Sequence, residues 1–241
     1  MTKLFTSLFA VLVASVTSVA SAQAPAPAQG QGQAPAAPAA SAQATAPAGS
    51  AAAIESKVAM CIGCHGIPGY QSSFPEVYRV PMISGQSARY IAAALNAYKT
   101  GDRKHPSMRG IAAGLSEEEI NEIAAWYEKR GTAKVEGTTP SREPSTQVAA
   151  LLQKAACASC HGATYSNPID PSYPKIAGQH KDYLYVALKA YKIDNNPVQG
   201  RNNAIMAGIA KQFTNAELKA IADYVGALEG ELQVQPQSRF K

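Results

Sequence analysis

Cys61-Ile62-Gly63-Cys64-His65 decides the fold of this chain, because the pattern returns 96 positions later as Cys157-Ala158-Ser159-Cys160-His161. Two further segments recur in the same order. They are Pro81-Met82-Ile83-Ser84-Gly85-Gln86 with Pro174-Lys175-Ile176-Ala177-Gly178-Gln179, and Met108-Arg109-Gly110-Ile111-Ala112 with Met206-Ala207-Gly208-Ile209-Ala210. Their offsets, 93 and 98, differ only by loop-sized slips. The repeat therefore predicts two copies of one domain rather than a solenoid of small units.

Composition places the boundaries of these copies. Residues 1–22 carry Lys3, an apolar stretch and the small-residue site Ala20-Ser21-Ala22, which predicts a cleavable secretory signal peptide, with an uncleaved anchor as the alternative. Residues 23–53 are uncharged and rich in Ala, Pro, Gln and Gly, which predicts a disordered segment. The two domains are expected at 54–130 and 145–230, with a linker at 131–144 and a C-terminal tail at 231–241.

The overall composition excludes some classes of function. The chain has 241 residues, of which 16% are charged and 46% hydrophobic, and its net charge is +5. That charge is too small for the clustered basic surface of a nucleic-acid-binding protein. A single Trp and 7% aromatic residues also argue against a platform that stacks single-stranded bases. No nucleic-acid partner is expected.

Both copies are predicted to be helical. Residues 86–100 place Tyr90, Leu95 and Tyr98 on one helical stripe. Residues 116–119 and 214–217 have the pattern of a capping box, and apolar side chains at helical spacing follow each of them. No run alternates with a period of two, so no strand is predicted. The expected fold class is all-α.

The Cys-x-x-Cys-His motif predicts covalent haem attachment. Two Cys three positions apart at a helix end place both sulfur atoms on one side of a turn, where they can form thioethers, and the adjacent His can bind the iron. Two motifs predict two haem c groups, attached through Cys61, Cys64, Cys157 and Cys160, with His65 and His161 on the iron. Disulfides, a thioredoxin-like pair and a zinc site are the alternatives. The 92 residues between Cys64 and Cys157 far exceed the usual zinc-ribbon spacing of about 15–20 residues.

The second axial ligand of each iron follows by elimination. After His161 the only methionine is Met206, and its repeat partner is Met108. Met82 aligns with Lys175, and Met60 adjoins an attachment cysteine, so neither is favoured. His105 or an open position remains the alternative in the first copy, and His180 or an open position in the second. A Met/His pair closes the iron and raises its reduction potential, which suits an electron carrier.

Residues around the ligands also repeat. The carbonyl groups of Pro81 and Pro174 are expected to accept a hydrogen bond from the ring of the ligating His. Arg103 and Arg201 match at an offset of 98, shortly before each Met. Either they pair with haem propionates or they are solvated surface side chains.

With these motifs the chain resembles the dihaem class I cytochromes c, and most closely the cytochrome c4 family, over about residues 54–230. The resemblance implies two tandem class I cytochrome c domains, each a small helical fold around one haem. It implies the same attachment cysteines, proximal His65 and His161, and distal Met108 and Met206. It also implies a periplasmic electron carrier without substrate turnover, which passes electrons from a cytochrome bc complex to a haem–copper terminal oxidase.

Two other functions stay open at this point. The chain could be the electron-accepting subunit of a periplasmic dehydrogenase, docked through the loop at 66–80, which is three residues longer than its counterpart in the second copy. A dihaem peroxidase-type enzyme would need one iron with an open or displaceable ligand. Contact with a membrane is expected only through partners, unless the N-terminal segment is retained.

Overall fold

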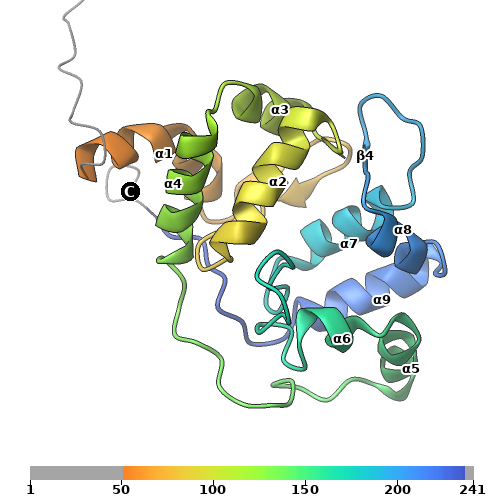
Figure 1. The fold of residues 1–241 in the computed structure, drawn as a ribbon. Helices are drawn as coiled ribbons and strands as arrows, with labels where there is room; N and C mark the ends of the chain where they lie inside the picture. The colour runs from red at the N-terminus through yellow and green to blue at the C-terminus, as the bar shows by residue number, and fades with distance from the viewer. Residues whose placement is uncertain (1–50, 237–241) are drawn as a thin grey trace, which may run out of the picture. The chain divides into compact units, whose positions relative to one another are not determined.

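A computed structural model describes residues 51–236, which fold into two helical lobes (Figure 1). The elements of the first lobe are α1 (Ala51–His65), β1 (Gln71–Ser72), β2 (Tyr78–Arg79), α2 (Ala88–Thr100), β3 (Arg103–Lys104), α3 (Pro106–Ala113) and α4 (Glu117–Glu128). Those of the second lobe are α5 (Thr146–Ala155), α6 (Cys157–His161), α7 (Lys181–Ala190), β4 (Gly200–Arg201), α8 (Ala204–Ala210) and α9 (Asn215–Val225). The order of helices in the second lobe repeats that of the first, with α5 and α6 in the place of α1.

Helices α4 and α9 begin at the two predicted capping boxes, which the structure confirms. The Ser116 hydroxyl accepts from the N–H of Glu119 at 3.1 Å, and the Glu119 carboxylate accepts from the N–H of Ser116 at 3.0 Å. Thr214 and Glu217 make the same pair of bonds at 3.2 and 2.7 Å. Each box satisfies N–H groups that a helix start leaves free, so it fixes where the last helix of each lobe begins.

Each lobe has its own apolar core. The predicted stripe of α4 is buried, with Ile120, Ile123 and Ala124 at most 2% exposed. Its counterpart in α9, formed by Leu218, Ile221 and Ala222, is buried as well. Cys61 packs against the core of the first lobe and Cys157 against that of the second. The two cysteine motifs therefore rest on equivalent parts of the two cores.

The structure contains short strands where none was predicted. β1 pairs with β2, and β3 pairs with β4, both antiparallel. Each strand has two residues, too few to show an alternating pattern, and the β3–β4 ladder joins segments that are far apart in sequence. That ladder sets Arg103 of one lobe opposite Arg201 of the other.

The chain after α9 returns to the first lobe. The N–H of Gln233 donates to the carbonyl of Ser84 at 3.1 Å, and the N–H of Thr132 donates to the carbonyl of Glu231 at 3.0 Å. The Glu231 side chain is buried and pairs with Lys175. Residues 231–233, within the predicted C-terminal tail, therefore tie both lobes together.

The N-terminal predictions lie mostly beyond the described part of the chain. The signal peptide at 1–22 and all but the last three residues of the segment at 23–53 fall outside residues 51–236. Helix α1 begins at Ala51, so those last three residues are helical rather than disordered. Within residues 51–236, no helix has the length and apolar character needed to cross a membrane.

Candidate functional site

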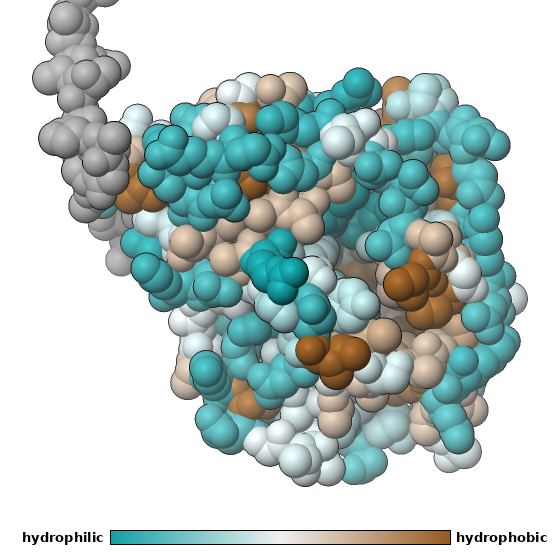
Figure 2. All heavy atoms as spheres, viewed as in Figure 1, coloured by the Kyte–Doolittle hydropathy of each residue, from teal (hydrophilic) through white to brown (hydrophobic). Residues whose placement is uncertain are grey.

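A cavity of about 1260 Å³ extends through both lobes, and both repeats of the sequence line it. Side chains of the two cysteine motifs, of Met108 and of Met206 all face this space. In the space-filling view, hydrophilic side chains cover most of the visible face, and apolar atoms gather around a hollow in it (Figure 2). The predicted site residues, which are spread over 146 positions, therefore share one cavity.

The first cysteine motif ends helix α1, and the second makes up helix α6. All four cysteines are half-buried, and none forms a disulfide. Burial raises the pKa of the Cys61 thiol and raises the pKa of Cys157 to about 11. Thiols held neutral by burial are poor redox nucleophiles, which argues against a thioredoxin-like pair. No group of three or more His, Cys, Asp or Glu within residues 51–236 could hold a metal ion, which argues against zinc.

Each motif histidine is oriented by the proline carbonyl that the sequence predicts. His65 Nδ1 lies 2.8 Å from the carbonyl oxygen of Pro81, and His161 Nδ1 lies 2.9 Å from that of Pro174. A carbonyl oxygen only accepts, so Nδ1 carries the proton in both rings and Nε2 keeps its lone pair. Burial lowers the pKa of both histidines, which also favours the neutral ring. Both imidazoles are thus prepared to bind a metal through Nε2.

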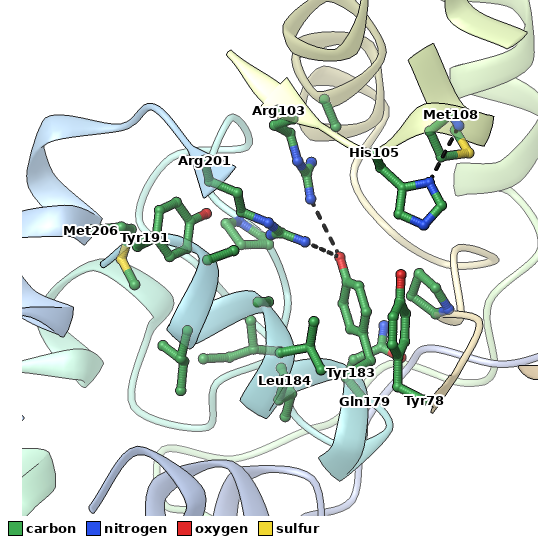
Figure 3. A pocket seen from close by; sticks show the side chains of 18 of the residues that line it. Tyr78, Arg103, His105, Met108, Gln179, Tyr183, Leu184, Tyr191, Arg201 and Met206 are labelled. Carbon is green, nitrogen blue, oxygen red and sulfur yellow. Dashed lines mark hydrogen bonds between the residues drawn. The ribbon is translucent and has the colours of Figure 1, made fainter. Parts of the chain in front are cut away.

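Met108 and Met206 stand at equivalent places in the first turns of α3 and α8. The His105 ring nitrogen Nδ1 accepts from the N–H of Met108 at 3.4 Å, and Asn203 Oδ1 accepts from that of Met206 at 2.9 Å. Each cap holds the helix turn that carries the methionine. Both side chains are half-buried and line the cavity. Figure 3 shows His105 bonded to Met108 beside this space.

The competing ligand candidates have other contacts. His105 is the N-cap of α3, which explains why it aligns with Asn203 in the repeat. His180 is the N-cap of α7 and does not line the cavity. Met60 is 64% exposed, and the backbone of Met82 is bonded to Gln179 of the other lobe. His105, Met60 and Met82 also line the cavity, but Met108 and Met206 are the pair that stands at equivalent, capped positions in the two repeats.

The two repeated arginines converge on one phenol. The Nη2 groups of Arg103 and Arg201 donate to the hydroxyl oxygen of Tyr183 at 3.3 and 3.0 Å (Figure 3). Burial alone would raise the pKa of Tyr183, but the two guanidinium charges outweigh it and lower the pKa to about 8. Tyr90, the repeat partner of Tyr183, has a pKa raised by burial to about 12.

This arginine cluster fits the acidic edge of a haem. Among residues 51–236, no carboxylate forms a salt bridge with Arg103 or Arg201, and Arg103 Nε is buried without a hydrogen-bond partner. Two neighbouring half-buried cations repel one another and are stabilised by anions close by. Haem carries two carboxylates at one edge, so the arginines, the cavity and the cysteine motifs fit the same group. Of the two interpretations of these arginines, the propionate partner is thus the better supported.

Some contacts of the site were not predicted. Gln86 and Gln179 reach across the lobe boundary, and Tyr183 bridges the two arginines. The only sign of these contacts in the sequence was that the same glutamine ends both Pro-x-Ile-x-Gly-Gln segments. Part of the loop at 66–80 faces the second lobe rather than solvent, because Arg79 binds Asp182 and Glu76 binds Lys189. Tyr70 and Val77 of that loop remain exposed.

Two helical lobes, each with a Cys-x-x-Cys-His motif, a carbonyl-bonded histidine and a methionine on one cavity, define a c-type cytochrome with two haem sites. The Cytochrome c family model matches residues 145–229. Cytochrome c4 of Pseudomonas aeruginosa is 27% identical over 184 residues, which is 75% of this chain and 89% of that protein. Cytochrome c-554(548) of Halomonas halodenitrificans is 42% identical over 82 residues, which is 33% of this chain and 94% of that protein.

A further relative is named thiosulfate dehydrogenase electron acceptor, from Stutzerimonas stutzeri, and is 29% identical over 68% of this chain and 76% of that protein. The crystal structure of reduced recombinant cytochrome c4 from Pseudomonas stutzeri matches with a TM-score of 0.53 and 25% identity, over 76% of this chain and 100% of that one. The chain belongs to the cytochrome c4 family of dihaem class I cytochromes c. It is an electron-transfer protein with two covalently bound haem c groups, and not an enzyme with its own substrate.

Proposed function

We propose that each lobe holds one haem through its own motif. The attachment residues are Cys61 and Cys64 in the first lobe and Cys157 and Cys160 in the second. The axial ligands are His65 with Met108, and His161 with Met206. The observation that carries this assignment is that both sets line one cavity, each with its histidine bonded to a proline carbonyl and its methionine on a capped turn.

The bound haem supplies one-electron chemistry at its iron. The protein residues keep that chemistry simple. Pro81 and Pro174 fix the histidine rings, and the caps of α3 and α8 hold the turns with the methionines, so these four residues would keep both ligands on each bound iron. An iron held in this way by His and Met would have no free position for peroxide or oxygen, and it would need little rearrangement when its charge changes. Such a site passes electrons on and does not turn over a substrate.

Spectra of the purified protein in both oxidation states test these ligands. We expect two low-spin haems and no binding of carbon monoxide. Met108→Ala and Met206→Ala should each open one haem, which then becomes high-spin and binds carbon monoxide. If the unsubstituted protein already binds carbon monoxide at one haem, that iron is not held by its methionine, and the peroxidase-type alternative gains support.

We further propose that the protein works in the periplasm, between a quinol-oxidising cytochrome bc complex and a haem–copper terminal oxidase. The support is its membership of the cytochrome c4 family together with the motif of a cleavable signal at residues 1–22. N-terminal sequencing of the mature protein tests the signal. Oxidation of the reduced protein by membranes that contain the oxidase, at a rate that rises with protein concentration, tests the partner.

A second candidate partner is a periplasmic dehydrogenase. It is favoured by the relative named thiosulfate dehydrogenase electron acceptor. Reduction of the protein by a thiosulfate dehydrogenase and thiosulfate, measured against reduction by a bc complex and quinol, separates the two. The faster route identifies the electron donor.

A further inference from the structure

The side chain of the glutamine that ends each Pro-x-Ile-x-Gly-Gln segment bonds to the other lobe. Gln86 and Gln179 are each only 4% exposed, although glutamine is usually a surface residue. Each side chain crosses the lobe boundary. Gln179 Nε2 donates to the carbonyl of Met82 at 2.8 Å, and Gln86 Nε2 donates to the carbonyl of Lys175 at 2.9 Å.

The oxygen of each amide accepts from the same residue of the other lobe. The N–H of Met82 donates to Gln179 Oε1 at 3.0 Å, and the N–H of Lys175 donates to Gln86 Oε1 at 2.9 Å. A second backbone N–H, from the residue that follows each glutamine, donates to the same oxygen at 3.0 Å. Two N–H donors on one side fix which amide atom is the oxygen. Gln86 and Gln179 therefore each make two hydrogen bonds to one residue of the opposite lobe. We call this pair of contacts the glutamine latch.

The bonded N–H groups belong to the peptide groups that orient the histidines. The peptide between Pro81 and Met82 accepts from His65 through its oxygen, and donates to Gln179 through its nitrogen. The peptide between Pro174 and Lys175 accepts from His161 and donates to Gln86. Each glutamine is thus linked to the histidine of the opposite lobe through one planar amide.

A peptide polarises when its N–H donates, because electron density moves toward its oxygen. The carbonyl then becomes a stronger acceptor for the Nδ1–H of the histidine. A histidine that donates a stronger hydrogen bond is a more basic ligand, and a more basic ligand stabilises the oxidised iron. The glutamine therefore acts on the iron through a chain of two hydrogen bonds.

We infer that Gln179 lowers the reduction potential of the first-lobe haem and that Gln86 lowers that of the second-lobe haem, each across the lobe boundary. Both are positioning residues, since neither contacts a ligand atom. This crossed tuning rests on the proposed function, in which His65 and His161 bind the irons. The pairing of the lobes then does more than bring the two haems close together, because the hydrogen-bond chain of each histidine ends on a glutamine of the other lobe.

Redox titration of the haem-loaded full chain tests the crossed pattern. Gln179→Met keeps the length of the side chain but removes both bonds. It should raise the potential of the first-lobe haem and shift its reduction equilibrium about two- to tenfold, with little change in the second. Gln86→Met should do the reverse. The Met108→His and Met206→His variants show which step of the titration belongs to which haem, because loss of a methionine ligand lowers the reduction potential of the substituted site.

Two controls separate tuning from loosening of the interface. Ser87→Ala removes a hydrogen bond from the buried Ser87 to the carbonyl of Pro171 in the other lobe. It leaves the Pro81–Met82 and Pro174–Lys175 peptides unchanged, so both reduction potentials should stay the same. Gln179→Glu offers the same donor and acceptor only when its carboxyl is protonated, so its potential should approach the wild-type value as the pH falls through the pKa of that carboxyl. It also keeps the test possible if the methionine variant does not fold.

Nuclear magnetic resonance of the reduced protein gives an independent reading. In Gln179→Met the Nδ1–H signal of His65 should move toward that of a weaker hydrogen bond, while that of His161 stays in place. Unchanged potentials, equal shifts in both haems, or a shift in the substituted lobe would overturn the inference. Failure of the proposed ligands would instead be visible in the unsubstituted protein, as a spectrum without two low-spin haems.

Discussion

Arg103 and Arg201 are partners in the β3–β4 register and share a single acceptor, the hydroxyl group of Tyr183. Equivalent arginines of the two repeats thus bind the same residue, but the two equivalent tyrosines, Tyr90 and Tyr183, are not used alike. Tyr183 receives both arginines, whereas the ring of Tyr90 lies 5.7 Å from the Arg103 guanidinium carbon. One phenol with a pKa lowered by two cations and one with a pKa raised by burial give the two sides of the boundary different electrostatics.

Loss of either arginine should lower the reduction potentials. Arg103→Gln removes a half-buried positive charge, which otherwise favours the carboxylates and disfavours the oxidised iron. We expect the mean of the two potentials to fall by about 60 mV, which is tenfold in equilibrium for one electron. Tyr183→Phe keeps both charges and should change the potentials much less. Spectroelectrochemistry checks both variants, and an unchanged mean in Arg103→Gln would contradict the propionate assignment.

His105 should matter for stability and not for ligation. Its Nδ1 caps α3 as Asn203 caps α8. His105→Asn should therefore keep the cap, whereas His105→Ala should cost about 1 kcal/mol of unfolding free energy. Both variants should keep a low-spin first haem that does not bind carbon monoxide. Urea unfolding and visible spectra measure the two effects. Carbon monoxide binding to His105→Ala, as fast as to Met108→Ala, would show that His105 is the ligand.

The ion pair of Arg79 with Asp182 should make the lobe contact sensitive to acid. The Arg79 Nε lies 3.0 Å from Asp182 Oδ2. Burial alone would raise the pKa of Asp182, but its bonds to Arg79 lower it below the usual value of 3.8. A lowered carboxyl pKa gives stability that is present above the unfolded-state pKa and lost as the pH falls through the folded-state value.

Asp182→Asn should therefore lower the unfolding free energy by about 1 kcal/mol near neutral pH, since the pair is partly exposed and screened by solvent. Near pH 3 and below, the variant and the unsubstituted protein should approach one another. Urea unfolding over this range measures the difference. Asp194→Asn is the matched control, because its pair with Lys211 lies within one lobe and is more exposed. A difference for Asp182→Asn that does not change with pH would contradict the role of its charge.

The local features of the fold could be predicted from the sequence. The capping box at Ser116, the buried stripe that follows it, and the carbonyl partner of His65 all depend on neighbours in the chain or on the repeat. A repeat also supplies an internal comparison, which identifies Met108 through Met206. These features were predictable because short-range spacing determines them.

The contacts between the lobes were not predictable in this way. Gln86 meets Lys175, and Ser84 meets Gln233, at separations that leave no local pattern. Strand β3 has two residues, and its pairing depends wholly on a partner about a hundred positions away. A long-range hydrogen bond depends on the packing of both lobes, so the repeated glutamine draws attention to position 86 but the sequence around it does not identify its partner.

Gly85 precedes Gln86 and tests how tightly the lobes are held. Its φ is +87°, and a Cβ there would lie 2.5 Å from the carbonyl oxygen of Glu231 and 2.6 Å from Gly131 Cα. Gly101 has the same φ of +87°, but a Cβ there would meet nothing within 4 Å. Gly101→Ala should thus cost only backbone strain, about 1–2 kcal/mol of unfolding free energy.

Gly85→Ala should cost more than Gly101→Ala, about 3 kcal/mol or above, because backbone on the facing segment must move. The displaced segment is the chain after α9 that binds both lobes, so the variant should also be cleaved sooner by a protease near residues 231–233. Urea unfolding of the two variants measures the excess cost, and timed proteolysis locates it. Equal destabilisation of the two variants would mean that the segment at residues 231–233 moves away from Gly85 at little cost. The lobes would then be held together by their other contacts, such as the glutamine latch, the arginine cluster and the Arg79–Asp182 pair.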